Sequence, residues 1–237
     1  LCENDYFEIV KFLLKSNKSK LITEKSLHLA AEKNNYNIVY LLLSQEENND
    51  IKQNAFKKCN KLTQIEIPSN LKKIGNGSFY GCKSLHKLTI PTSITTIDDY
   101  AFYECLSLTE IQIPSSITVI QKGIFKGCSS LKKITLPSTI TKIEDFAFYE
   151  CSSLIEISIP NSVTSIGTFS FCKCSSLQKI TIPTSITSID QNSFSLCNSI
   201  KQIKIPSSIT TIDDFLFNLC SNLIEVILPN SLISIGN

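Results

Sequence analysis

The sequence repeats itself every 23 residues from Ile51 to its last residue, Asn237. A period of about 20–30 residues with apolar residues at set positions predicts a solenoid, in which each repeat forms one coil. Because the core of such a stack consists of equivalent packing positions, we expect any function on its outward-facing side chains. The repeating leucine position is held by Leu62, Leu85, Leu108, Leu131, Leu154, Leu177, Ile200 and Leu223, and the eight prolines, from Pro68 to Pro229, follow the same interval.

Each repeat is expected to contain two short extended segments joined by turns. Around Pro114, the alternation Glu110-Ile111-Gln112-Ile113 predicts a strand with one buried face. Proline has no N–H for a strand ladder, so it is expected to end that strand. Ile117 and Ile120 predict a second extended segment on the opposite wall, and the stretch 121–128 predicts a compact turn or a short helical piece.

Eight of the ten cysteines, from Cys59 to Cys220, occupy one position of the repeat, three residues after a phenylalanine. Equivalent side chains in stacked coils point the same way, which favours a column of buried thiols over the geometry of a disulfide. Disulfides between coils about 4.8 Å apart are the alternative. Cys2 and Cys172 lie outside the column, and Cys172 takes a position that other repeats give to tyrosine, so it is expected to be an exposed thiol.

Residues 1–44 follow another pattern. The stretch Ser26–Leu43 resembles the ankyrin repeat, and Asp5–Leu14 resembles the second half of a preceding one. The resemblance implies paired helices, with His28 as the structural histidine that bonds the backbone across a turn. We therefore expect three parts: ankyrin-like repeats at 1–44, a polar junction at 45–50 and the solenoid at 51–237.

Over residues 51–237, the pattern L-x-x-I-x-I-P … I-x-x-I … A-F-x-x-C resembles the BspA-like, or Treponema pallidum-type, leucine-rich repeat. The resemblance implies a solenoid with a parallel sheet and a protein-binding function. Members of that family are cell-surface or secreted adhesion proteins in bacteria, and they are abundant in some protists. The Lys-, Asn- and Ile-rich composition fits an AT-rich protist genome.

Composition excludes several other functions. All 23 basic residues are lysines and the net charge is +2, which argues against specific nucleic-acid binding. No apolar run approaches the ~18 residues of a membrane span. The two histidines lie in different parts of the chain, and there is no Gly-rich phosphate loop, no CxxC pair and no Cys/His cluster of zinc-site spacing. We expect no enzyme activity, no cofactor and no metal, and we interpret paired acids such as Glu144-Asp145 as the first turn of a helix.

These observations predict a non-catalytic protein–protein interaction scaffold. The alternative is a cell-surface antigen or adhesin that binds host or matrix protein. The compartment is expected to be cytoplasmic if the ankyrin part dominates, and the cell surface if a signal peptide precedes Leu1.

The candidate binding residues lie at two outward positions of the predicted strand and near the last repeat. Charge alternates along the first position, and the second is mostly neutral and polar, so these side chains either stabilise the sheet or bind a protein. The candidates are Lys87, Glu110, Lys133, Glu156 and Lys179 at the first position, Thr89, Gln112, Thr135, Ser158 and Thr181 at the second, and Ile224 and Ile227, which with Ile233 replace mostly polar residues. A second candidate face is aromatic and lies on the turn side, at Tyr100, Tyr103, Phe146, Tyr149, Phe169 and Phe215.

Overall fold

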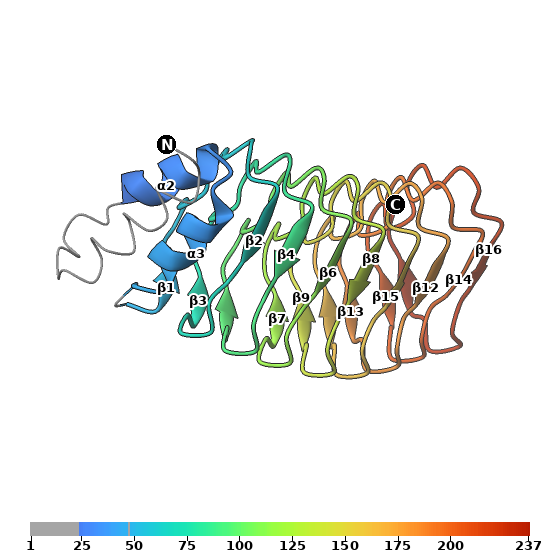
Figure 1. Ribbon diagram of the computed structural model, residues 1–237. Coiled ribbons are helices and arrows are strands. Elements are labelled where there is room, and N and C mark those ends of the chain that lie inside the picture. The colour runs from blue at the N-terminus through green and yellow to red at the C-terminus, as the bar shows by residue number, and fades with distance from the viewer. Residues whose placement is uncertain (1–23, 47) are drawn as a thin grey trace.

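The computed structural model describes residues 24–46 and 48–237, which form a pair of helices followed by a stack of coils (Figure 1). Helix α2 (Glu24–Glu32) and helix α3 (Tyr36–Leu43) pack against each other at one end of the stack. Leu27, Ala30 and Ala31 recur at helical spacing and are buried. The ankyrin-like stretch at residues 5–14 and Cys2 lie outside the described residues.

Every coil contributes one three-residue strand and one two-residue strand, on two different walls. The first wall, here called the sheet face, contains β2 (Gln64–Glu66), β4 (Lys87–Thr89), β6 (Glu110–Gln112), β8 (Lys133–Thr135), β10 (Glu156–Ser158), β12 (Lys179–Thr181), β14 (Gln202–Lys204) and β16 (Glu225–Ile227). The second wall contains β1 (Asp50–Ile51), β3 (Lys73–Ile74), β5 (Thr96–Ile97), β7 (Val119–Ile120), β9 (Lys142–Ile143), β11 (Ser165–Ile166), β13 (Ser188–Ile189), β15 (Thr211–Ile212) and β17 (Ser234–Ile235).

The strands confirm the predicted alternation and register. In β6, Ile111 is buried between the exposed Glu110 and Gln112, and the strand ends before Pro114. Its neighbour β8 is parallel, and Glu110 lies opposite Lys133, 23 residues later. The solenoid with parallel sheets that the repeat predicts is therefore confirmed.

Hydrogen-bonded strand pairing is interrupted along both walls. On the sheet face, the strands pair as β2-β4, β6-β8, β10-β12 and β14-β16; on the second wall they form the ladders β1-β3-β5, β7-β9-β11-β13 and β15-β17. The interruptions coincide on both walls at two places, between the coils of β4/β5 and β6/β7 and between those of β12/β13 and β14/β15. We call these two places the seams.

The third side of each coil consists of tight turns, not helix. Two positions per coil adopt positive φ, as at Phe146 (56°) and Glu150 (61°). Gly123 holds the first of these positions in its own coil, and a Cβ there would lie 2.3 Å from the ring of Tyr100. Our prediction of a helical first turn around Glu144-Asp145 is wrong, because the chain enters a tight turn there. Asp145 Oδ1 instead accepts the backbone N–H of Thr168 in the next coil at 3.0 Å.

A column of phenylalanines and a column of cysteines run through the core. Successive phenylalanine rings stack with centroids 4.9 to 6.0 Å apart, from Phe56 to Phe217. The eight column cysteines are free thiols, seven of them buried and Cys220 partly so, which confirms the reduced column. Each thiol from Cys82 onward donates to the carbonyl of the phenylalanine 26 residues earlier, as Cys128 does to Phe102 at 3.1 Å. Burial raises the pKa of Cys128 to about 12.

The expectation that Cys172 is exposed is wrong, since only 3% of its surface is accessible. Tyr149, at the equivalent position of the preceding coil, is half-buried. The cysteine side chain is shorter than that of tyrosine and does not extend beyond the neighbouring coils, so those coils cover it. Burial raises the pKa of Cys172, while Lys173 and a hydrogen bond with Ser195 act in the opposite direction.

The helix pair covers the end of the stack near β2 and supplies acceptors that a preceding coil would otherwise provide. The side-chain oxygen of Asn34, in the turn between α2 and α3, accepts the Thr63 N–H at 2.9 Å. In a later coil the equivalent N–H, that of His86, bonds to the Thr63 carbonyl. Within residues 24–46 and 48–237, the His28 ring makes no hydrogen bond to the backbone across a turn, which the ankyrin resemblance implied; its Nδ1 lies 3.4 Å from Cys59 Sγ.

Candidate protein-binding face

The structure brings ten of the twelve predicted binding residues together on the sheet face. Their strands, β4 to β12, lie side by side in chain order (Figure 1). The first and third residues of each strand are exposed while the middle residue faces the core. The result is a polar surface with two outward rows: Lys87, Glu110, Lys133, Glu156 and Lys179 in one, and Thr89, Gln112, Thr135, Ser158 and Thr181 in the other.

Two shallow grooves follow this surface. One has a volume of about 520 Å³ and lies over β4, β6 and β8, with Thr89, Gln112 and Thr135 in its lining. The other, of about 890 Å³, lies over β8, β10 and β12 and is lined by residues that include Thr135, Ser158 and Thr181. The neutral row therefore borders both grooves, and its hydroxyl and amide groups can donate and accept hydrogen bonds there.

The charged row is in register but not tightly paired. Glu110 lies opposite Lys133 and Glu156 opposite Lys179 in parallel pairs. Among the described residues, no ion pair within 4 Å joins members of this row. Exposed charges at this separation each contribute little to stability, so they remain free to contact a partner.

Helix α3 borders the sheet face at the β2 end. Tyr36 and Tyr40, each 41% exposed, line a hollow of about 570 Å³ together with Glu66, Lys87 and Thr89. Sequence reasoning missed both tyrosines, because their role depends on how the helix packs against the first strands. Their exposure, on a helix whose other apolar residues are buried or partly buried, is the signal that the structure adds. Exposed aromatic side chains are frequent anchors in protein interfaces.

Ile224 and Ile227 belong to the coil of β16 and do not line either of the two grooves. Ile227 ends β16 and continues the row of Ser158 and Thr181, whereas Ile224 precedes the strand. Their exposed fractions are 83% and 38%, and that of Ile233 is 82%. The three isoleucines lie on two walls: Ile224 and Ile227 on the sheet face, and Ile233 directly before β17 on the second wall.

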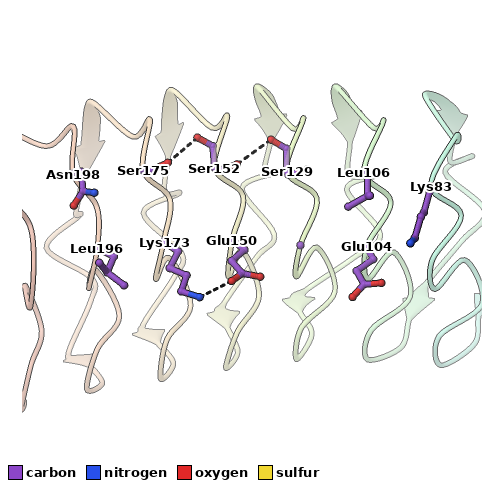
Figure 2. Close-up of a pocket in the computed structure, with 11 residues that line it drawn as sticks. Lys83, Glu104, Leu106, Ser129, Glu150, Ser152, Lys173, Ser175, Leu196 and Asn198 are labelled. Carbon is purple, nitrogen blue, oxygen red and sulfur yellow. Dashed lines mark hydrogen bonds and ion pairs between the residues drawn. The ribbon is translucent and has the colours of Figure 1, made fainter.

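A further groove, of about 670 Å³, runs along the turn side across several coils (Figure 2). Lys83, Glu104, Glu150 and Lys173 contribute charges of both signs to its lining. Lys173 Nζ lies 2.6 Å from Glu150 Oε1, and this bond raises the pKa of Lys173. Serines of the same groove bond from coil to coil, as Ser152 Oγ does to the Ser129 carbonyl at 3.3 Å (Figure 2). These contacts join neighbouring coils, so stabilisation of the stack accounts for the polar side chains that line this groove.

The aromatic residues of the turn side pack between coils. Phe146 and Phe169 stack at 5.3 Å, and Lys126 Nζ lies 5.0 Å from the centroid of Phe146 and 4.9 Å from that of Tyr149. Phe215 is the most exposed of the set, at 48%. The rings are therefore largely engaged with one another, which makes this side a weaker candidate than the sheet face.

One cluster within residues 24–46 and 48–237 brings metal-binding side chains together. His28, Glu32 and Cys59 have ligand atoms within 4.8 Å of one another. They lie at the contact between helix α2 and the first coil, away from the sheet-face grooves. No spacing rule pointed to this cluster, because its members come from two different sequence patterns.

A 23-residue coil, short parallel strands and a core of leucine, isoleucine and phenylalanine columns define a leucine-rich-repeat solenoid. The family described as the BspA type leucine rich repeat region matches residues 49–159 and 141–237, in six copies. The chain belongs to this family.

Solved structures with the same fold support the assignment. A leucine-rich repeat protein of T. pallidum is 29% identical, with a TM-score of 0.59 and 73% of each chain covered. The pneumococcal vaccine antigen PcpA is 20% identical, with a TM-score of 0.51 over 79% of this chain and 57% of PcpA, and this likeness supports the fold alone. No curated protein matches the sequence significantly. None of the helices in the described part of the chain has the length and hydrophobicity that a membrane crossing requires.

Proposed function

We propose that the protein is a non-catalytic interaction scaffold that binds a protein partner through the sheet face. The supporting observation is the neutral row from Thr89 to Thr181, which borders two adjoining grooves. Flanking charges of both signs supply specificity more than affinity. Tyr36 and Tyr40 supply aromatic anchors at one edge. Repeat families use extended surfaces of this kind for protein recognition.

The test compares two triple variants of equal charge and bulk in capture experiments. The first, Thr135→Arg, Ser158→Arg and Thr181→Arg, places three arginines in the larger groove. The matched control, Thr96→Arg, Ser188→Arg and Thr211→Arg, places them at exposed positions of the second wall. We expect proteins captured by the wild type to be lost with the first variant and retained with the control. If both variants still capture the proteins that the wild type captures, binding occurs at another surface.

The alternative function is that of a cell-surface antigen or adhesin that binds host or matrix protein. It is supported by the family to which the chain belongs, and it uses the same binding face. The two functions differ in compartment. Antibody labelling of intact cells that express the protein, compared with permeabilised cells, separates them: labelling of intact cells supports the adhesin.

We also propose that α2 and α3 are an ankyrin-like unit and that the chain divides at residues 45–50. Support comes from the packing of the two helices against each other and from the turn at Asn34, whose φ is 57° at a position that the ankyrin pattern gives to glycine. A fragment of residues 48–237 tests the division. If it melts as cooperatively as the whole chain, the solenoid is an independent unit.

A further inference from the structure

The first cysteine of the column has an environment unlike that of the others. From Cys82 onward, each thiol donates to a phenylalanine carbonyl of the preceding coil, at 2.9 to 3.2 Å. Cys59 has helix α2 in place of a preceding coil. Its Sγ lies 3.4 Å from His28 Nδ1 and 3.9 Å from the His28 carbonyl.

Helix α2 places two possible metal ligands beside this sulfur. His28 and Glu32 are four residues apart, so they lie on the same face of the helix. One ligand atom from each of these residues and Cys59 Sγ all lie within 4.8 Å of one another. Cys59 is buried, whereas His28 and Glu32 are partly accessible. The cluster therefore combines a protected sulfur with an open side through which an ion can enter.

The donor set and the spacing match zinc. Zinc bonds to sulfur at about 2.3 Å and to imidazole nitrogen at about 2.0–2.1 Å, which places the two atoms roughly 3.5 Å apart in a tetrahedral site. The distance between Cys59 Sγ and His28 Nδ1 is 3.4 Å. The Glu32 carboxylate lies within 4.8 Å of the other two ligand atoms, and because its side chain is partly accessible it can move closer to complete the set. Thiolate and imidazole do not favour Mg²⁺ or Ca²⁺, which prefer oxygen ligands.

The geometry points to a binding site for one zinc-type divalent ion, held by Cys59, His28 and Glu32 with water as the fourth ligand. Cys59 binds as the thiolate, and its proton passes to solvent. Because two ligands come from α2 and the third from the first coil, the ion clamps the helix pair onto the solenoid. The competing explanation is a simple S–H···N hydrogen bond that replaces the missing phenylalanine carbonyl.

Cobalt(II) is the direct probe, since it occupies zinc sites and reports thiolate coordination by a charge-transfer band in the near ultraviolet. The protein is used with Cys2→Ser, so that this residue contributes no signal. We expect one cobalt per chain, a thiolate band, and loss of that band when zinc is added. Cys59→Ser should abolish the band, and His28→Gln should weaken binding about tenfold or more.

His86→Gln is the matched control, because this second histidine is exposed and its ring contacts the Ser84 carbonyl. It should bind cobalt as the wild type does. Hydrogen exchange gives a second readout: zinc should slow exchange in α2 of the wild type and leave it unchanged in Cys59→Ser, which removes the ligand that the first coil contributes. Absence of a thiolate band, or an equal band in folded Cys59→Ser, would overturn the site and leave the hydrogen bond as the explanation.

Discussion

At the scale of single residues, each coil depends on two backbone positions that favour glycine. The second of them is held by Gly81 and Gly127 in two coils and by larger residues elsewhere, including Leu219 with a φ of 57°. A left-handed conformation costs an ordinary residue about 1–2 kcal/mol, whereas glycine adopts it freely. Coils with a larger residue at this position therefore carry backbone strain that glycine would remove.

Leu219→Gly should stabilise the protein by about 0.5–1 kcal/mol, after allowing for the greater freedom of glycine in the unfolded chain. Leu219 is 65% exposed, so little burial is lost. Leu228→Gly, at an exposed leucine without positive φ, is the control and should destabilise. Denaturant unfolding measures both. A loss of stability in Leu219→Gly would mean that its side chain contributes more than its exposure indicates.

The cysteine column predicts a loss of stability at alkaline pH. Burial raises the pKa of column thiols such as Cys105, Cys128 and Cys151 above the unfolded value of about 8.5. The folded state keeps these protons while the unfolded state releases them, so stability is intact below about pH 8.5 and falls as pH rises toward the folded pKa. Each thiol lowers the free energy of unfolding by about 1.4 kcal/mol per pH unit in that window.

Cys128→Ser separates this effect from other alkaline changes. Serine can still donate to the Phe102 carbonyl but does not titrate. We expect the dependence of unfolding free energy on pH, measured by urea unfolding between about pH 8 and 11, to become shallower by the contribution of one thiol. An unchanged slope would show that the column does not determine the alkaline sensitivity.

At the scale of strands and rows, the alternating charges disfavour misaligned stacking more than they stabilise the fold. Lys133 lies opposite Glu110 and beside the strand of Glu156. Lys133→Glu should therefore place like charges on adjacent strands and cost about 0.5–1 kcal/mol at low salt, and less at high salt.

Lys132→Glu makes the same charge change between the neutral residues Thr109 and Ile155 of the adjacent coils, so it should cost less. Thermal unfolding at low and high ionic strength compares the two variants. Equal melting of both at low salt would show that the row has no role in register.

The sequence predicted the elements of the solenoid closely because the repeat samples each position eight times. The strand position, the buried Ile111 and the free thiols of the column followed from that repetition. The turns could not be predicted in this way. Their two positive-φ positions accept glycine, asparagine, phenylalanine and lysine alike, so they leave no consistent signal in the sequence. Contacts between the two sequence patterns, such as Cys59 with His28, were also beyond reach, because they depend on how helix and coil pack.

At the scale of the whole molecule, the two ends of the stack differ. The helix pair covers the core near β2, whereas Ile224, Ile227 and Ile233 expose apolar surface at the other end. We predict that these three isoleucines drive self-association, because they occupy outward positions that earlier coils give mostly to polar residues, and large exposed apolar surface is uncommon on isolated proteins.

The triple variant Ile224→Thr, Ile227→Gln and Ile233→Thr should shift the protein toward the monomer in sedimentation velocity measured over a range of concentrations. Because the residues are exposed, little change in melting temperature is expected. A wild type that remains monomeric at high concentration would contradict the prediction.

The seams have a mechanical consequence. Backbone pairing stops on both walls there, so neighbouring coils are joined by the turn side and the core, as by the Phe102–Phe125 stack and the bond from Cys128 to Phe102. Under tension applied at the two ends, such joints should yield before a wall with continuous hydrogen bonds does. A single-molecule stretching experiment should then show β6–β13 giving way as one block and the flanking coils in separate steps. Under force, the molecule would therefore extend as three separate groups of coils that part first at the two seams.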